Sequence, residues 1–274
     1  MATADQHTVN EQSAASAFSK QSYVFDDIYT GNPIIQYKRA RVREHVNRFL
    51  APGSHILELN AGTGEDSVYF AQAGHRVHAT DVADGMLQAL TAKVNAHQLE
   101  KQVSIEKCSF TALHTLQQKG PYDLIFSNFA GLNCTGQLRQ VLVSLWPLLK
   151  PKGQITLVLL PPFCLWETIL ALRGQFKLAF RRFNSKKGRT AYVEGIPFTC
   201  WYYKPSFVTE ALQQDYEILG LEGLCTIVPS SYLEQLPARY PKAYRFLTAL
   251  ENRWKGKWPW RHIGDYYIIS LRKR

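Results

Sequence analysis

Short apolar runs alternate with amphipathic stretches along the first 160 residues. The runs at 55–59, 76–80, 103–106, 122–127 and 154–159 have the length and composition of strands buried on both faces. The stretches between them place apolar side chains at helical spacing, as do residues before and after this region. Helices are therefore predicted over 34–50, 65–73, 84–97, 111–117, 136–148 and 205–214.

Strands separated by helices predict a parallel sheet with helices on both faces. Two further apolar runs, 216–225 and 266–271, bring the predicted number of strands to seven. The sequence therefore indicates an α/β fold with a doubly wound, Rossmann-like sheet.

Two stretches break this alternation, 161–204 and 226–264. Both are too long for ordinary connections, and insertions of this kind in compact domains usually form lids or substrate-binding elements. We therefore expect a leader or lid over residues 1–33, a catalytic domain over 34–274, and a substrate cap made by the two insertions.

The turn after the first strand has the chemistry of a nucleotide-binding turn. Gly62 and Gly64 allow a ligand to approach the main chain, and Asn60 tolerates a positive φ better than most residues. Asp81 closes the second strand, where a carboxylate can accept hydrogen bonds from both hydroxyls of an adenosine ribose. The strand, the turn and the acid together predict an adenosine-containing cofactor.

The same turn argues against a dinucleotide. A dinucleotide fold needs a third glycine where this chain has Ser67. The chain also carries an acid, Glu58, two residues before the turn, and a carboxylate there repels a pyrophosphate but suits a cationic ligand. These features favour S-adenosylmethionine, and an oxidoreductase that uses a dinucleotide is the weakest alternative.

Four segments occur in an order that resembles the class I S-adenosylmethionine-dependent methyltransferases, of the type that acts on small molecules. They are LELNAGTGED, HATDVADGML, YDLIFSNFAGLN and LLKPKGQITLVLL, and the match spans residues 23–160. The resemblance implies S-adenosylmethionine as cofactor and a seven-stranded, mostly parallel sheet whose last strand, 266–271, is antiparallel.

The resemblance also assigns parts of the cofactor to successive turns: methionine to the first, ribose to the acid of the second strand, adenine to the residues that follow the second and third strands, and the transferable methyl to the turn after the fourth. The residues are, in that order, Glu58, Asn60, Ala61, Gly62, Thr63 and Gly64; Asp81; Val82, Met86, Ser109 and Phe110; and Asn128 and Phe129. Tyr23 and Tyr29 of the leader are expected to close over the cofactor.

Two positions depart from the family pattern. Asn60 replaces the usual first glycine, and Ser109 stands where such enzymes often have Asp. We therefore expect adenine recognition to depend more on backbone groups in this chain. Because of Asn60, a second alternative also stays open, in which the protein binds the cofactor without catalysis and serves as a regulatory subunit.

Methyl transfer from a sulfonium is an in-line displacement, so positioning and water exclusion can suffice. A general base is needed only for an acceptor that must lose a proton. None of the eight histidines joins a recognisable dyad, so no catalytic residue is named. No His or Cys has the spacing of zinc ligands, so no metal is expected, and five scattered cysteines favour a reducing, cytoplasmic location.

Charge is distributed unevenly between the two halves of the chain. Residues 1–150 hold 13 Lys/Arg and 13 Asp/Glu, whereas 151–274 hold 19 and 9. Seven basic residues and no acid lie between Glu167 and Glu194, interleaved with bulky apolar residues. This pattern favours a small or lipid-like, anionic acceptor and a peripheral membrane contact through 173–189. An RNA methyltransferase is the main alternative, because basic patches also bind phosphates.

Overall fold

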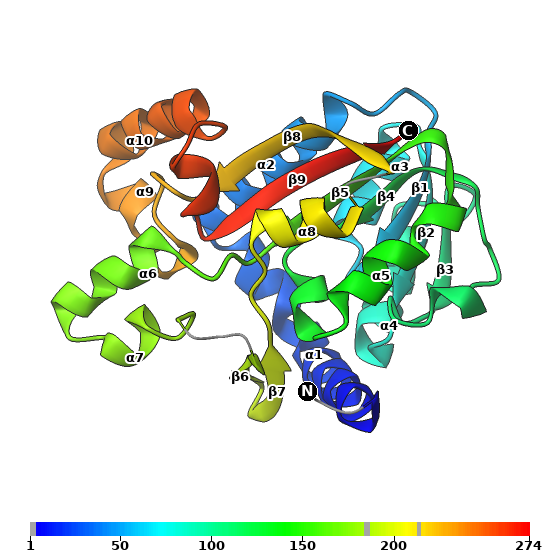
Figure 1. Cartoon of the computed structure of the whole chain (residues 1–274), viewed down its shortest axis with the longest axis horizontal. Helices are drawn as coiled ribbons and strands as arrows, with labels where there is room; N and C mark the ends of the chain where they lie inside the picture. The colour runs from blue at the N-terminus through cyan, green and yellow to red at the C-terminus, as the bar shows by residue number, and fades with distance from the viewer. Residues whose placement is uncertain (1–3, 184–186, 213–214) are drawn as a thin grey trace.

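The computed structural model describes residues 4–183, 187–212 and 215–274, with a seven-stranded sheet at its centre (Figure 1). The strand order is β3-β2-β1-β4-β5-β9-β8; β1 to β5 run parallel, and β9 is antiparallel to both of its neighbours. The strands are β1 (His55–Leu59), β2 (Arg76–Asp81), β3 (Val103–Lys107), β4 (Tyr122–Ser127), β5 (Leu149–Leu159), β8 (Tyr216–Leu224) and β9 (Tyr266–Lys273). The predicted doubly wound sheet, with an antiparallel last strand, is confirmed.

Helices cover both faces of the sheet because side chains alternate along each strand. Ile56 packs with α2 (Pro33–Asn47), α3 (Glu65–Gln72) and α4 (Asp84–Ala96) on one face. Its neighbour Leu57 packs with α5 (Leu138–Ser144) and α8 (Pro205–Leu212) on the other. The two buried clusters hold the carboxyl ends of the strands in a fixed arrangement.

Three predicted elements differ from the structure. The helix expected over 111–117 is a single 3₁₀ turn, Leu113–Thr115, and the helix expected over 136–148 ends at Ser144 and continues as a 3₁₀ turn, Trp146–Leu148. The fifth strand begins at Leu149 rather than residue 154, because Leu149 already pairs with Tyr122 before a shift in register. Pattern alone does not reveal such a shift.

The leader forms a 27-residue helix, α1 (Ala4–Thr30), which the sequence analysis did not assign. It is fastened by contacts to distant parts of the chain rather than by a strong amphipathic pattern. Ala14 and Ala17 are buried against Cys134 and Phe198. The Gly85 N–H donates to Ser19 Oγ at 2.8 Å, which ties α1 to the start of α4.

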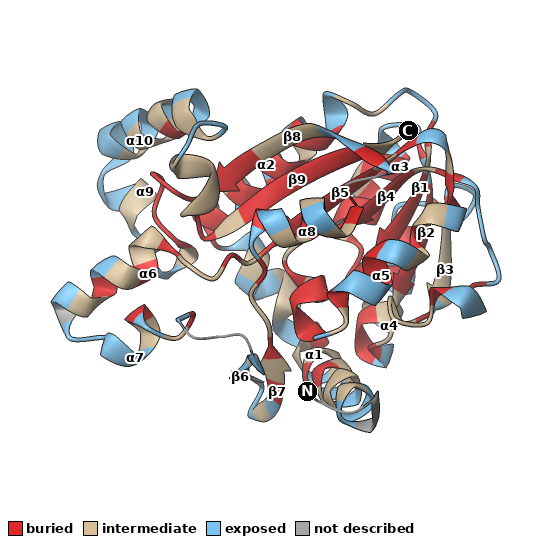
Figure 2. Cartoon of the chain, viewed as in Figure 1, coloured by how far each residue is buried: buried red, intermediate tan, exposed pale blue. Residues whose placement is uncertain are grey.

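The two insertions lie outside the sheet (Figures 1 and 2). The first contains α6 (Leu165–Ile169), α7 (Phe176–Ala179) and a hairpin of β6 (Arg189–Val193) and β7 (Ile196–Cys200); the second contains α9 (Leu236–Arg239) and α10 (Pro241–Trp254). The hairpin packs against α1, while the helices stand at the end of the sheet where β9 begins. Among the described residues, no helix combines the length and the apolar character needed to cross a membrane.

A buried cluster of charged side chains joins the first insertion to the sheet. Lys38 Nζ lies 2.6 Å from Asp265 Oδ2, and Arg182 Nη2 lies 2.7 Å from Asp265 Oδ1 and 2.6 Å from Glu167 Oε1. Burial alone favours the neutral acid, but the two cations lower the pKa of Asp265 to about 2. The cluster therefore stabilises the fold only while Asp265 is ionised.

This cluster predicts a specific loss of stability in acid. The pKa of Asp265 is lower in the folded chain than in the unfolded chain, so its contribution is complete above about pH 4 and is lost as the pH falls toward 2. The difference in unfolding free energy between the wild type and Asp265→Asn should shrink by about 1 kcal/mol between about pH 6 and pH 3. Urea titrations at both pH values measure it; a difference that stays constant would contradict the assignment.

Candidate functional site

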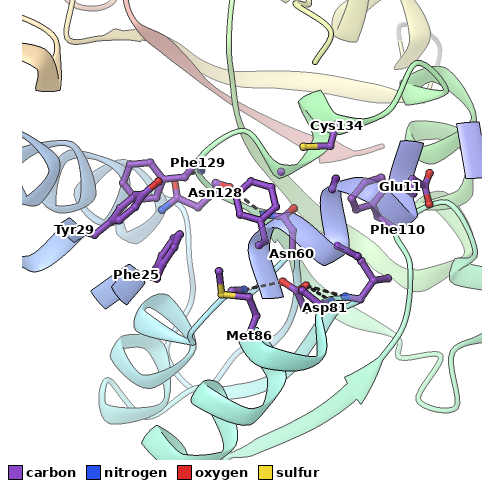
Figure 3. A pocket seen from close by; sticks show the side chains of 17 residues that line it. Glu11, Phe25, Tyr29, Asn60, Asp81, Met86, Phe110, Asn128, Phe129 and Cys134 are labelled. Atoms are coloured by element: carbon purple, nitrogen blue, oxygen red, sulfur yellow. Dashed lines mark hydrogen bonds between the residues drawn. The ribbon is translucent and has the colours of Figure 1, made fainter. Parts of the chain in front are cut away.

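A cavity opens at the carboxyl ends of β1, β2 and β4, beneath α1 (Figure 3). Its empty volume, which includes the open mouth, is about 740 Å³. The lining residues are Glu11, Ala14, Ala15, Phe18, Phe25, Tyr29, Asn60, Gly62, Asp81, Val82, Ala83, Met86, Phe110, Asn128, Phe129, Gly131 and Cys134.

The turn after β1 presents backbone to this cavity. Gly62 has φ +58°, and a Cβ built there meets no atom within 4 Å, so the space beside it is open to a ligand. Gly64 has a different role, because a Cβ at that position would collide with Leu90 of α4. Asn60, with φ +48°, links this turn to the end of β4. Its amide nitrogen donates to Asn128 O at 3.0 Å, and its amide oxygen accepts from Ser127 Oγ at 2.6 Å.

Asp81 reaches into the mouth formed by this turn. One carboxylate oxygen accepts from the Gly62 N–H at 2.9 Å, and the other from the N–H groups of Val82 and Ala83 at 2.8 and 2.9 Å. Burial raises the pKa of Asp81, while these three N–H groups oppose the rise. The carboxylate is held in one orientation and retains acceptor capacity toward the cavity.

Aromatic side chains close the side of the cavity next to the turn after β4. Phe25 and Tyr29 of α1 stack with ring centroids 4.0 Å apart, and the edge of Tyr29 meets Phe129 at 6.2 Å. Phe129 and the following Ala130 have φ of +47° and +63°, so the turn itself holds this ring at the cavity wall. Figure 3 shows Phe129 and Asn128 between Tyr29 and Asn60.

The structure brings most of the sequence-predicted site residues together. Those that line the cavity are Tyr29, Asn60, Gly62, Asp81, Val82, Met86, Phe110, Asn128 and Phe129. Their assignment to parts of a ligand remains a prediction.

The other predicted residues do not line the cavity. Glu58 is buried, accepts a hydrogen bond from Ser67 of α3, and has a pKa raised by burial and by the charge of Asp66. Thr63 donates to Asp26 Oδ1 at 2.6 Å, which fastens the turn to α1. Tyr23 is 84% exposed. Ala61, Gly64 and Ser109 complete the group outside the lining.

The residues that α1 contributes to the cavity were not predicted from the sequence. Glu11, Ala14, Ala15, Phe18 and Phe25 line the cavity, as do Ala83, Gly131 and Cys134. The residues of α1 recur at intervals of three, four and seven, which is the spacing of one helical face. This spacing could have indicated the helix, but the stripe contains two alanines and an acid and so lacks the strongly apolar character that normally identifies a buried helical face.

The charge of the lining favours a cationic ligand. Two carboxylates, Asp81 and Glu11, line the cavity, and the described lining residues include no Lys, Arg or His. A pyrophosphate would meet no compensating cation there, whereas a sulfonium with an adenosine ribose would find an acceptor for its hydroxyls and a negative field. The cavity therefore fits S-adenosylmethionine better than a dinucleotide.

Positive charge gathers on the far side of Phe129. The Arg39 guanidinium lies 4.9 Å from the Phe129 ring centroid, and Lys38 Nζ lies 4.9 Å from that of Tyr266, which itself contacts Phe129. Arg39 and Arg43 both pair with Asp66, and the neighbouring Glu58 is largely protonated at neutral pH because burial and the charge of Asp66 raise its pKa to about 8. This wall therefore carries more positive than negative charge.

The cluster around Asp265 is similarly unbalanced. Lys38, Arg181 and Arg182 share two carboxylates, Glu167 and Asp265. Those two acids and Cys164 also have the spacing of metal ligands, with their ligand atoms within 4.8 Å of one another. Arg182 pairs with both acids, Lys38 with Asp265 and Arg181 with Glu167, so both carboxylates are already neutralised by the chain's own cations.

Comparisons with known proteins agree with this geometry. Residues 56–153 match a family model described as a methyltransferase domain. The chain is 23% identical over 270 residues to a tRNA 5-carboxymethoxyuridine methyltransferase of Escherichia coli K12, covering 96% of each protein. It is 33% identical over 100 residues to a malonyl-[acyl-carrier protein] O-methyltransferase of Serratia marcescens, covering 35% of each.

Solved structures share the fold at low identity. One is a 1,6-didemethyltoxoflavin N1-methyltransferase of Burkholderia thailandensis with bound 1,6-didemethyltoxoflavin and S-adenosylhomocysteine. It aligns with a TM-score of 0.59 and 16% identity over 100% of this chain and 91% of its own. The shared architecture includes the sheet whose carboxyl edge forms the cavity.

Proposed function

We propose that the chain is a class I S-adenosylmethionine-dependent methyltransferase that methylates an anionic oxygen of a small, lipid-like acceptor. The observation that carries the proposal is the excess of positive charge behind Phe129, beside the turn where the family resemblance puts the acceptor. Cations at that wall attract an acid group toward the transferable methyl.

The cofactor, when bound, supplies an electrophilic methyl group on a sulfonium. The turn 60–64 and Asp81 would hold it, with Val82, Met86 and Phe110 beside its base. Tyr29 and Phe129 would exclude water from the reacting centre. Holding donor and acceptor in line can then supply most of the rate enhancement.

An acid acceptor also explains why no base stands at this wall. Burial raises the pKa of Tyr29, so its phenol stays protonated, and the described lining residues include no histidine. A carboxylate has no proton to lose before it attacks, so it requires no general base. A phenol, or an amine in its protonated form, would require one.

The names of two relatives support an acid acceptor. The Escherichia coli protein is named for a carboxymethoxy group on uridine, and the Serratia marcescens protein for a malonyl group. Each name specifies a group that includes a carboxyl, although one group is attached to a tRNA and the other to an acyl-carrier protein.

Methyl transfer to a carboxylate predicts an alkali-labile product. Incubation with labelled cofactor and fractionated cell extract should label a fraction that partitions into organic solvent, and mild alkali should release the label as volatile methanol. Label that survives alkali would contradict an ester product. Extracts treated with ribonuclease serve as the parallel arm and should give the same yield.

RNA methylation is the second candidate, favoured by a relative that matches over 96% of each chain and by the basic second half of the sequence. It predicts ribonuclease-sensitive label and an RNA affinity that falls steeply with salt. Cofactor binding without labelled product in any fraction would instead favour the silent regulatory subunit.

The first insertion presents a surface that suits a lipid-like acceptor. Leu172, Phe176 and Phe180 are 88%, 62% and 50% exposed, and Lys177 lies among them. No acid occurs from 168 to 193, so the surface is apolar and positively charged. Lys186 of the basic segment 173–189 lies outside the described residues. We propose that this surface docks on anionic lipid at the cytoplasmic side of a membrane.

Docking on lipid predicts a charge-dependent association with vesicles. The protein should sediment with vesicles of phosphatidylcholine and phosphatidylglycerol but not with phosphatidylcholine alone. The double variant Phe176→Ser, Phe180→Ser should bind about tenfold more weakly, because each exposed ring adds apolar area to the contact. Val143→Ser removes an exposed apolar residue of α5 and should leave binding unchanged; equal losses in both variants would contradict the assignment.

A further inference from the structure

Ser109, two residues beyond the end of β3, stands where the family often has an acid, and α1 brings an acid to the same point. Ser109 and Thr111 both donate to Glu11 Oε2, each at 2.9 Å. Glu11 lies 98 residues away from Ser109 in the sequence. The acid at this position is therefore supplied by the leader helix rather than by the strand end.

Glu11 also faces the cofactor cavity. It lines the cavity together with Val82 and Phe110, the residues expected beside adenine, and Figure 3 shows Glu11 next to Phe110. Asp81, at the ribose position, lines the same cavity. The cavity thus has one carboxylate where ribose is expected and a second where the edge of adenine is expected.

A carboxylate can accept about four hydrogen bonds, and the two hydroxyls use two of them. The exocyclic amino group of adenine is a donor, whereas the oxygen at the same position of hypoxanthine is an acceptor. A carboxylate at the edge of the base would therefore attract adenine and repel hypoxanthine.

We propose that Glu11 accepts a hydrogen bond from the exocyclic amino group of adenine, so that the lid helix α1 selects the base of the cofactor. The proposal rests on the cofactor of the proposed function and adds a specificity residue to its site. Ser109 and Thr111 act as positioning residues, because their hydroxyls hold the Glu11 carboxylate at the cavity edge.

The proposal gives α1 a role in cofactor exchange. The helix is already fastened by Asn10, which donates to Cys134 O at 2.8 Å and to Thr199 O at 3.1 Å, and by the contact between Phe18 and Phe198. A hydrogen bond from the adenine to Glu11 would add a contact that holds α1 in place only when the cofactor is bound. Base recognition and closure of the lid are then a single event.

The experiment compares two ligands by calorimetry: S-adenosylhomocysteine and S-inosylhomocysteine, which carries oxygen in place of the amino group. The wild type should strongly prefer the adenosyl ligand. Glu11→Gln should reduce that preference at least about tenfold. The glutamine amide nitrogen is a donor, so it pairs poorly with the amino group of adenine but well with the oxygen of hypoxanthine. The hydroxyls of Ser109 and Thr111 can still donate to the glutamine oxygen in this variant.

Two further variants separate base selection from lid docking. The double variant Glu11→Gln, Ser109→Asp should regain the preference for adenine, because it returns a carboxylate to the same place from the strand end. Asn10→Ala loosens α1 without touching the base and should weaken both ligands by the same factor. This control has no reason to change the preference.

The outcomes are distinct. An unchanged preference in Glu11→Gln, or a uniform loss for both ligands as in Asn10→Ala, would overturn the role of Glu11 while leaving the cofactor assignment intact. Failure of the wild type to bind S-adenosylhomocysteine would instead overturn the proposed function.

Discussion

Asp81→Asn should bind S-adenosylhomocysteine at least about tenfold more weakly than the wild type, because a charge-assisted hydrogen bond to a ribose hydroxyl is worth about 1.5–3 kcal/mol. The backbone N–H groups of Gly62, Val82 and Ala83 now donate to both oxygens of the carboxylate. In the variant, the asparagine amide nitrogen would replace one of these oxygens and would bring two donors face to face. The variant therefore loses both the charge and the fixed orientation of the acceptor. Calorimetry measures the affinity.

Asp84→Asn provides the matched control. Asp84 is another acid at the end of the same turn, but its side chain is 66% exposed, pairs with Lys107 on the surface and does not line the cavity. Its substitution should leave the affinity unchanged. Equal affinities for the Asp81 variant and the wild type would remove the ribose assignment.

Gly62→Ala should lower the affinity for the same ligand by at least about tenfold while leaving the protein folded. The Cβ would point into space that no protein atom fills, so the collision is with the ligand rather than with the chain. The positive φ of +58° adds a strain of about 1 kcal/mol, which lowers the melting temperature modestly.

Gly53→Ala isolates the strain from the collision. Gly53 also has a positive φ, +69°, and open space around a Cβ, but it lies in the turn before β1 and does not line the cavity. Both variants should lose similar stability, and only Gly62→Ala should lose affinity. If both variants bind the ligand like the wild type, the ligand does not approach the main chain at residue 62.

The parts of the site that are local in sequence could be predicted from it. A buried strand followed by Asn60 and two glycines has few alternatives, because the chain must reverse in a left-handed conformation directly after β1. Asp81 follows by the same logic one strand later. The observed hydrogen bond between the Gly62 N–H and Asp81 joins these two turns.

The direction of a side chain was harder to predict. Glu58 lies in the same motif as Asn60, but its side chain faces α3 and Ser67 rather than the cavity. The acids that do line the cavity are Asp81 and Glu11. Carboxylates suited to a cationic ligand therefore do line the cavity, but they are Asp81 and Glu11 rather than Glu58.

The helical structure of the leader could not be predicted because its contacts are distant in sequence. The amphipathic signal of α1 is weak, and its position depends on partners such as Cys134, Phe198 and Gly85. The contribution of Glu11 depends on its meeting with Ser109. Only the folded chain brings the two together.

The central claim is that the cavity beneath α1 holds an adenosyl sulfonium, and a crystal structure of the complex with S-adenosylhomocysteine tests it most directly. The account predicts the ribose hydroxyls within hydrogen-bond distance of Asp81 and the sulfur near Phe129. A saturated complex in which the ligand lies elsewhere, with the Asp81 carboxylate free of it, would contradict the account.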